Sequence, residues 1–396
     1  MGLNDTPNAD RIHISFFGMR NAGKSSVVNA LTGQSLSIVS DIKGTTTDPV
    51  SKAMELLPLG PVLITDTPGF DDFGKIGSMR VKKAKQVLNK TDVAVLVVDS
   101  SVGLCQNDKD LIELFKKKNI LYIIAFNKCD IKNIRTLNEN EIAVSAKENI
   151  NIYKLKELIG KLAKEKHSDK TIISHMLSTC DIVILVTPID ESAPKGRIIL
   201  PQVKVIRDIL DAHAIAVTVQ TGQLKETLSS LKEKPKLVIT DSQDFNVVKD
   251  IVPTDIPLTS FSVLFANFKG ILKNAVKGAF SLSELDDNDT VLICEGCTHH
   301  RQCNDIGTVK LPEWIKNFTK KQLNFEFTSG LDYVDDLSRY KLIIHCGGCM
   351  LNEREVMYRM NSALDVGIPF TNYGTVIAHI NGILKRSIEI FNFDNL

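Results

Sequence analysis

The sequence predicts an α/β protein with three parts: a doubly wound P-loop domain, a middle α/β association domain and a C-terminal α/β domain with a metal site. Three observations lead to this fold class. Short β-rich apolar runs alternate with amphipathic stretches over residues 11–165. A glycine-rich loop ending in Lys-Ser follows the first apolar run. Cysteines and histidines gather near the C-terminus, where further strand-like runs end.

The domain boundaries follow from length and from changes of pattern. A chain of 396 residues exceeds what one hydrophobic core usually holds. The charged segment 161–170 suggests the first boundary, and the pattern changes again near Phe265. We therefore expect domains at 1–168, 169–264 and 265–396. The middle domain has no glycine-rich turn or Lys-Ser pair, so it is predicted to have a structural role, including dimerisation. The third domain is expected to begin with a helical run over 267–279.

Composition excludes some classes of function. The net charge is +1 and aromatic residues make up 6%, which argues against a large nucleic-acid surface. Hydrophobic residues at 43% and charged residues at 24% are typical of soluble globular proteins. No apolar stretch is long enough to cross a membrane, and the N-terminus lacks a secretory pattern. A cytoplasmic protein without membrane or nucleic-acid partners is expected.

The strongest motif is the GxxxxGKS match from Gly18 to Ser25, directly after the strand-like IHISFF. Glycines allow successive backbone N–H groups to wrap phosphates, Lys24 is expected to reach the β- and γ-phosphates, and the Ser25 hydroxyl is expected to bind Mg²⁺. The next helix adds its N-terminal dipole to this anion site. The predicted nucleotide contacts of the loop are Gly18, Asn21, Ala22, Gly23, Lys24, Ser25 and Ser26.

Further elements of a GTPase follow in order. The run VLITDTPG predicts a strand ending at Asp66, which suits the magnesium site, and Gly69 is placed to bond the γ-phosphate. Among Thr45 to Thr47 we favour Thr46 as the switch-loop hydroxyl. Lys24, Asn21, Thr46, Asp66 and Gly69 are the predicted catalytic set.

The base-recognition elements specify guanine. Asn127, Lys128 and Asp130 follow a strand, and an aspartate here can accept both N1–H and N2–H of guanine, which adenine does not offer. Ser145, Ala146 and Lys147 are predicted to close over the base. GTP and Mg²⁺ are therefore the expected ligands.

The cysteine and histidine residues form two groups, CEGCTHHRQC over 294–303 and HCGGC over 345–349. Each CxxC spacing puts two thiolates on one tight turn, and two strand ends can converge on one metal centre. From the ligands alone, zinc and iron–sulfur both remain open.

Residues 10–165 resemble the TrmE, Era and Der group of GTPases, whose P-loop also reads NAGKSS. The resemblance implies that Asn21 helps to bind a K⁺ ion that supplies the charge of an arginine finger. Phe70 stands where Ras-like proteins carry a water-orienting glutamine, so slow, potassium-stimulated hydrolysis is expected.

The whole chain resembles the HydF family of FeFe-hydrogenase maturation GTPases through Cys297-Thr-His299 and His345-Cys346-Gly-Gly-Cys349. The resemblance implies a scaffold that holds a 4Fe-4S cluster, receives a two-iron precursor made by radical enzymes and delivers it to the apo-hydrogenase. It also implies a homodimer.

The resemblance assigns Cys297, Cys346 and Cys349 as cluster ligands, which leaves one iron open. For the fourth position Asp305, His299 and His345 rank above Cys303, because oxygen or imidazole ligands exchange more readily than a thiolate; His300 is also near in sequence. Cys294 and Cys303 lie outside the family motif, so whether either one binds the cluster is open.

Two other functions compete with this one. A ribosome- or tRNA-associated GTPase with a zinc module would fit the GTPase domain, but the neutral charge argues against it. A redox enzyme is disfavoured, because a site with only three cysteine ligands suits electron relay poorly.

Overall fold

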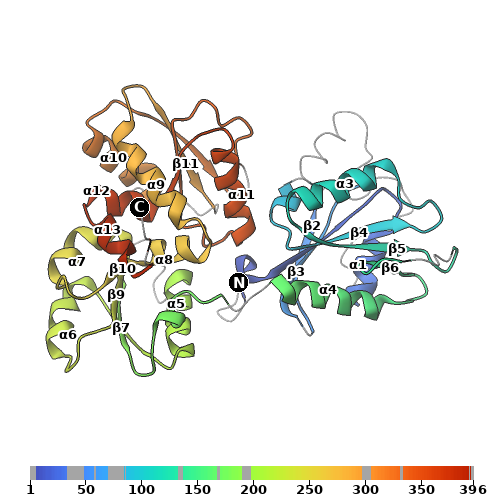
Figure 1. Cartoon of the computed structure of the whole chain (residues 1–396), viewed down its shortest axis with the longest axis horizontal. Coiled ribbons are helices and arrows are strands. Elements are labelled where there is room, and N and C mark those ends of the chain that lie inside the picture. Colours follow the sequence, from blue (N-terminus) through green and yellow to red (C-terminus); the bar gives the residue numbers. More distant parts are fainter. Residues whose placement is uncertain are drawn as a thin grey trace. The chain divides into compact units, whose positions relative to one another are not determined.

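The computed structural model describes residues 6–33, 49–57, 59–69, 84, 86–132, 137–166, 170–189, 198–296, 305–330, 333–391 and 393, with the backbone alone at 165 and 166. The chain divides into two compact units, Met1–Asp169 and Lys170–Leu396 (Figure 1). Each unit has its own sheets and core, so each is described by itself.

The N-terminal unit contains one six-stranded sheet in the order β2-β3-β1-β4-β5-β6. Strand β2 is antiparallel to β3, and the other neighbours are parallel. The strands are β1 (Ile12–Phe17), β2 (Val50–Leu56), β3 (Gly60–Asp66), β4 (Val93–Asp99), β5 (Leu121–Asn127) and β6 (Glu141–Ala143). The named helices are α1 (Lys24–Thr32), α3 (Gln106–Lys117) and α4 (Ile152–Lys166).

Both faces of this sheet are covered. Because side chains alternate along a strand, β1 sends Phe16 into the core shared with α1 and α4 and Phe17 into the core shared with α3. Phe17 and Phe115 of α3 pack with ring centroids 5.4 Å apart. The predicted doubly wound P-loop domain is confirmed.

The C-terminal unit contains two four-stranded parallel sheets, in the orders β10-β9-β7-β8 and β12-β11-β13-β14. The first consists of β7 (Ile182–Val186), β8 (Ile215–Val219), β9 (Leu237–Thr240) and β10 (Leu258–Ser260). The second consists of β11 (Thr290–Glu295), β12 (Asn324–Ser329), β13 (Leu342–His345) and β14 (Phe370–Asn372). The predicted α/β class therefore holds for this part of the chain as well.

Helices connect and cover these strands. They are α5 (Leu200–Asp211), α6 (Leu224–Ser230), α7 (Phe245–Ile251), α8 (Phe261–Phe268), α9 (Leu272–Phe280), α10 (Leu311–Thr319), α11 (Glu353–Leu364), α12 (Tyr373–Ile380) and α13 (Leu384–Ile388). A single π-helical turn, Ile306–Lys310, precedes α10. The helical run expected over 267–279 is wrong as one helix: Gly270 adopts φ 72° and separates α8 from α9.

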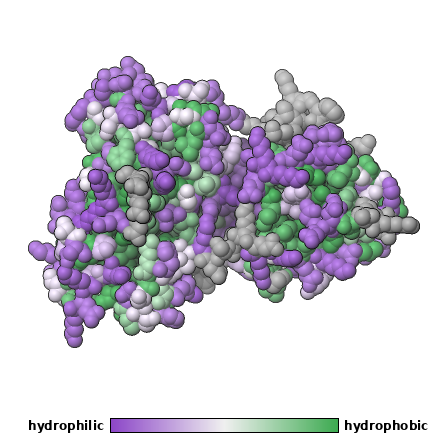
Figure 2. Space-filling view, in the orientation of Figure 1, coloured by the Kyte–Doolittle hydropathy of each residue, from purple (hydrophilic) through white to green (hydrophobic). Residues whose placement is uncertain are grey.

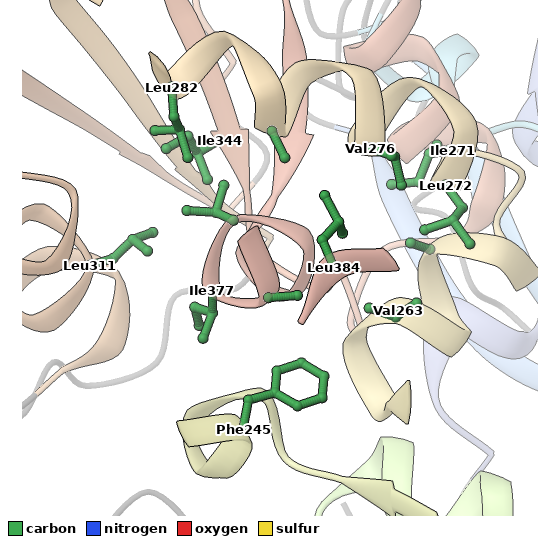
Figure 3. Close-up of a cluster of buried hydrophobic side chains, with 14 of the residues drawn as sticks. Phe245, Val263, Ile271, Leu272, Val276, Leu282, Leu311, Ile344, Ile377 and Leu384 are labelled. Carbon is green, nitrogen blue, oxygen red and sulfur yellow. The ribbon is translucent and has the colours of Figure 1, made fainter. Parts of the chain in front are cut away.

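One hydrophobic core joins the two C-terminal sheets. Phe245 from the first half lies in the same buried cluster as Leu311, Ile344 and Leu384 from the second (Figure 3). Helix α8 contributes to this cluster through Val263 and to a separate one around β7 through other side chains. The expected boundary at 264/265 falls within α8, and the three-domain division remains a prediction.

On the face shown in Figure 2, hydrophilic and apolar residues are intermixed. No helix within the described residues combines the length and the apolarity that crossing a bilayer requires.

Candidate functional site

The P-loop connects β1 to α1 and is held by close backbone packing. Gly18 has φ 139°, and a Cβ there would stand 2.2 Å from the Val97 carbonyl oxygen. Asn21 adopts φ 62°, a left-handed conformation that asparagine tolerates. Lys24 begins α1, and its ammonium donates to the carbonyls of Gly18 at 3.0 Å and Met19 at 2.8 Å. The lysine therefore lies inside the loop whose N–H groups are predicted to bind phosphates.

A magnesium position lies between this loop and β3. The Ser25 hydroxyl donates to Asp66 Oδ2 at 2.6 Å, and Asp66 is buried. Asp66 Oδ1 has no hydrogen-bond partner among the described residues. A buried carboxylate oxygen without a partner beside a serine hydroxyl fits the oxygen ligands that Mg²⁺ takes. Gly69 follows three residues after β3, whereas Thr46 and Phe70 lie outside the described residues.

Asn127 ties the base-recognition loops to the P-loop. Its amide nitrogen donates to the Ala22 carbonyl at 3.0 Å, and its amide oxygen accepts from Ala146 N at 3.1 Å. A Cβ at Gly23 would stand 2.2 Å from the same amide nitrogen. The Asn127 side chain thus connects the NKCD segment to both the P-loop and the SAK segment.

Lys128 extends this connection. It has φ 66°, donates to the Asn21 carbonyl at 3.0 Å and pairs with Asp99 at the end of β4. Sequence reasoning missed Asp99, although its place at the carboxyl end of a strand was a signal. Asp130 is exposed, which leaves its carboxylate accessible to a base.

The SAK loop has its own anchor. Ser145 is buried, and its hydroxyl accepts from Glu148 N at 3.1 Å. Lys147 is exposed, and Ser26 is half-buried in α1. The described part of the predicted nucleotide set therefore lies at the carboxyl ends of β1, β3, β5 and β6, where open α/β sheets bind ligands.

The second candidate site lies at the carboxyl ends of β11 and β13. Cys346 Sγ accepts hydrogen bonds from Gly296 N at 3.0 Å and Gly348 N at 3.3 Å, and Cys346 N donates to the Cys294 carbonyl at 2.8 Å. Gly348 adopts φ 60°, which the tight HCGGC turn requires. Burial raises the pKa of the Cys346 thiol, while the two N–H donors act in the opposite direction. Cys349 is half-buried on the same turn.

Two buried cations hold this turn, and sequence reasoning identified neither. Lys269, which follows α8, donates to the carbonyls of Gly348 and Leu351. Arg359 of α11 is 0% exposed, pairs with Glu355 at 3.0 Å and donates to the Gly330 carbonyl at 2.8 Å. Its position on a helix rich in charged residues gave no sign of burial.

Arg359 also fixes the ring of His345. Its Nη1 lies 3.3 Å from His345 Nε2, and His345 Nδ1 lies 2.7 Å from the Cys346 carbonyl oxygen. Because a guanidinium only donates, the network assigns Nε2 as the acceptor and Nδ1 as the protonated nitrogen. Burial and then the Arg359 cation lower the pKa of His345 to about 3. Both ring nitrogens thus have protein partners in this arrangement.

The remaining sulfur and carboxylate groups differ in accessibility. Cys294 is buried within β11, and burial raises its pKa to about 12. Asp305 is half-buried and caps the π-helical turn, with Oδ2 accepting from Thr308 N at 2.8 Å and Thr308 Oγ1 at 2.9 Å. Cys297, His299, His300 and Cys303 lie outside the described residues. Among the residues that are described, no three His, Cys, Asp or Glu side chains gather as a metal-binding group.

Three family models match the chain. Residues 13–128 match a 50S ribosome-binding GTPase model, residues 172–270 the hydrogen maturase F dimerization domain, and residues 273–390 the hydrogen maturase F tetramerization domain. The two hydrogen maturase F models together cover more than half of the chain.

Curated relatives match the N-terminal part. The tRNA modification GTPase MnmE of Desulforamulus reducens is 36% identical over 159 residues, which cover 37% of this chain and 34% of that protein. GTPase Der of Wolinella succinogenes is 38% identical over 125 residues, covering 31% and 26%. The chain thus spans about a third or less of the length of these relatives. A structure of an Era variant from Aquifex aeolicus bound to GDP and AlF4⁻ matches with 26% identity and a TM-score of 0.35, over 38% of this chain and 56% of that one.

Proposed function

Because the chain belongs to the HydF family of hydrogenase maturation GTPases, we propose that it carries an iron–sulfur cluster and delivers a two-iron precursor to an apo-hydrogenase. Its N-terminal domain is a P-loop GTPase domain, and it carries the dimerization and tetramerization domains of the family. GTP hydrolysis regulates the carrier, and the carrier step itself is not enzymatic.

The HCGGC turn carries this proposal. Cys346 Sγ accepts two backbone N–H groups, which stabilise a thiolate bound to iron, although burial raises the pKa of the free thiol. Cys346 and Cys349 therefore fit two of the ligands of a cluster whose third is Cys297, which lies outside the described residues. A 4Fe-4S cluster on three thiolates supplies one iron whose other ligand can exchange. Asp305 and His299 are the preferred protein ligands there over His345, because both ring nitrogens of His345 have protein partners.

Buried positive charge supports the same assignment. A cluster with three thiolates is anionic, and burying net negative charge is costly without nearby cations or donors. Lys269 and Arg359 both lie against the HCGGC turn and are buried, and of the two Arg359 already has a buried counter-ion in Glu355. Each orients a part of the turn, Lys269 through the Gly348 carbonyl and Arg359 through His345.

In the GTPase domain, Ser25 and Asp66 hold Mg²⁺, and Thr46 completes the site when the γ-phosphate is present. Lys24 and the backbone of Gly23 and Gly69 bind the phosphates. Asn21 binds K⁺ as the positive charge that assists hydrolysis. Two observations support the Mg²⁺ assignment. Ser25 donates a hydrogen bond to Asp66 at 2.6 Å, and the buried Asp66 Oδ1 has no partner among the described residues.

The proposed partners are the apo FeFe-hydrogenase, the radical-enzyme maturases and further copies of this chain in a homo-oligomer built on a homodimer. A ribosome- or tRNA-associated role has weaker support, because the relatives with such names match only the GTPase part.

Anaerobic reconstitution with iron and sulfide tests the carrier role. Wild type and Cys180→Ser, which changes an exposed thiol, should both bind about four iron atoms and give an iron–sulfur spectrum. Cys346→Ser should lose most of the iron. A colourless, zinc-only wild type would rule out the carrier, and an intact cluster in Cys346→Ser would rule out the ligand assignment.

The potassium role has its own test. GTP turnover should be faster in K⁺ than in Na⁺ at equal ionic strength, and Asn21→Ala should remove the difference. Equal rates in both salts for the wild type would overturn the role of Asn21.

A further inference from the structure

Tyr373 offers a hydroxyl group to which no described residue is hydrogen-bonded. It is the first residue of α12, directly after β14, the strand beside β13. The side chain is half-buried as a whole, but its hydroxyl oxygen is buried and has no hydrogen-bond partner among the described residues. A buried hydroxyl without a partner is costly, so such groups in native proteins call for an explanation.

The hydroxyl lies beside the proposed cluster site. A Cβ at Gly307 would stand 2.2 Å from the Tyr373 hydroxyl oxygen and 2.7 Å from Glu295 Oε1, so only glycine leaves this approach open. Glu295 is the residue before Gly296, whose N–H bonds Cys346 Sγ. Tyr373 therefore reaches the carboxyl end of β11, where the cysteine turn also lies.

The surroundings of the hydroxyl are acidic. Burial raises the pKa of Tyr373 well above its usual value, and Cys346, Glu295 and Asp305 act in the same direction. A tyrosine hydroxyl is in any case protonated at neutral pH and can therefore act as a donor. The Tyr373 hydroxyl is a donor that lies near acceptor groups but is hydrogen-bonded to none of them. It is therefore available to donate to a ligand that binds at this site.

We propose that the Tyr373 hydroxyl donates a hydrogen bond to a small anion that replaces the protein ligand at the open iron of the cluster. The inference rests on the proposed cluster site and adds a positioning residue for the ligand that exchanges there. The class of ligand is a small anion with a second acceptor atom, whether free or as part of an incoming metal precursor.

The position of Asp305 favours an incoming ligand. Asp305 Oδ2 already accepts two hydrogen bonds from Thr308, so the carboxylate is oriented by its own turn. The Tyr373 hydroxyl therefore stabilises the state in which another ligand, instead of Asp305, binds the open iron.

Cyanide is a suitable probe, since carbon can bind iron and leave nitrogen as an acceptor. Full-length wild type, Tyr373→Phe and Tyr340→Phe are reconstituted anaerobically, and cyanide binding is followed by the electron paramagnetic resonance of the reduced cluster. Tyr373→Phe should bind cyanide about tenfold more weakly, the effect of one hydrogen bond to a charged group. Tyr340→Phe is the matched control, because its buried hydroxyl bonds Glu326 and should leave cyanide affinity unchanged.

Thermal unfolding of the apoprotein gives a second measurement. Tyr373→Phe should unfold at the same temperature as wild type or higher, because the lost hydroxyl has no partner among the described residues, whereas Tyr340→Phe should unfold at a lower temperature.

The outcomes separate the two proposals. Equal cyanide affinity in wild type and Tyr373→Phe, both with full clusters, overturns the role of Tyr373 and leaves the carrier intact. Loss of the cluster in Tyr373→Phe also overturns it, since the protein itself would then need the hydroxyl. A wild-type cluster that does not bind cyanide has no exchangeable position and overturns it too. A wild type that binds no cluster overturns both.

Discussion

Gly23 and Gly33 flank helix α1 and share a left-handed backbone, with φ 87° and 65°. At Gly23 a Cβ would stand 2.2 Å from Asn127 Nδ2, whereas at Gly33 nothing lies within 4 Å. Gly23→Ala should therefore displace Asn127 and weaken GTP binding at least tenfold, roughly the loss of one or two hydrogen bonds. Gly33→Ala should cost only about 1 kcal/mol of stability through backbone strain.

Titration with a fluorescent GTP analogue measures both variants. Equal losses of affinity would contradict the contact between Gly23 and Asn127, because strain alone would then explain both.

Arg359 permits a comparison of two ion pairs with the same helical spacing. The Arg359–Glu355 pair is buried, with side chains 0% and 6% exposed, while Arg207–Asp211 is 77% and 54% exposed. Arg359→Met leaves a buried carboxylate without its cation and should destabilise the C-terminal unit by about 3–5 kcal/mol. Arg207→Met should have no measurable effect.

Chemical denaturation of the apoprotein measures the free energy of unfolding. Removing both charges with Glu355→Leu and Arg359→Met should recover part of the loss, because no buried charge then remains unpaired. A double variant less stable than Arg359→Met would contradict this account.

The nucleotide motifs could be placed at strand ends from the sequence, because GxxxxGKS, DTPG and NKCD each follow a strand-like apolar run. The places of Lys269, Arg359 and Tyr373 could not be predicted, because each depends on contacts between separate elements. Nothing in the local sequence of α11 distinguishes buried Arg359 from a solvated arginine, since its burial depends on Gly330 and His345. That no described residue bonds the Tyr373 hydroxyl likewise appears only in three dimensions.

At the scale of elements, Arg386 closes the C-terminal end of α7. Its guanidinium donates to the carbonyls of Val252 at 3.0 Å, Pro253 at 2.6 Å and Ile256 at 3.0 Å, with a longer bond to Lys249. Carbonyls at a helix end otherwise lack partners within the helix. Arg386 thus joins α13 to the segment that follows α7 in the middle of the C-terminal unit.

Arg386→Met should therefore destabilise this unit by about 1–3 kcal/mol, more than the loss of a single neutral hydrogen bond. Lys385→Met, which changes the exposed neighbouring cation, is the control and should have little effect. Thermal unfolding of the apoprotein measures both variants. Equal shifts would indicate that charge, rather than the hydrogen bonds to the carbonyls, matters at this helix.

Most strands were predictable from their apolar runs, but the break between α8 and α9 was not placed. The segment NFKGILKNAVKGA keeps helical periodicity across Gly270, so the pattern alone favours one helix. The positive φ at Gly270 turns the chain and positions Lys269 against the Gly348 carbonyl. This break places a buried cation at the candidate cluster site.

At the scale of the whole molecule, the sequence predicted three domains from changes of composition. The two C-terminal sheets nevertheless share one hydrophobic cluster that includes Phe245, Val276 and Ile344. Sequence composition does not reveal that the two sheets share a core. A strand buried on both faces has the same apolar sequence whether it packs against its own domain or against the next one.

Calorimetry of the full-length apoprotein should therefore give two transitions, one for each compact unit, rather than three. GTP with Mg²⁺ should raise only the transition of the N-terminal unit, since a ligand stabilises the unit that binds it. Phe115→Ala and Phe245→Ala form a matched pair, because both side chains are fully buried, one in each unit. Each should lose about 3–5 kcal/mol in its own transition alone. If Phe245→Ala instead split the C-terminal transition and left part of it at the wild-type temperature, the two sheets would unfold independently, and three domains would describe the chain better.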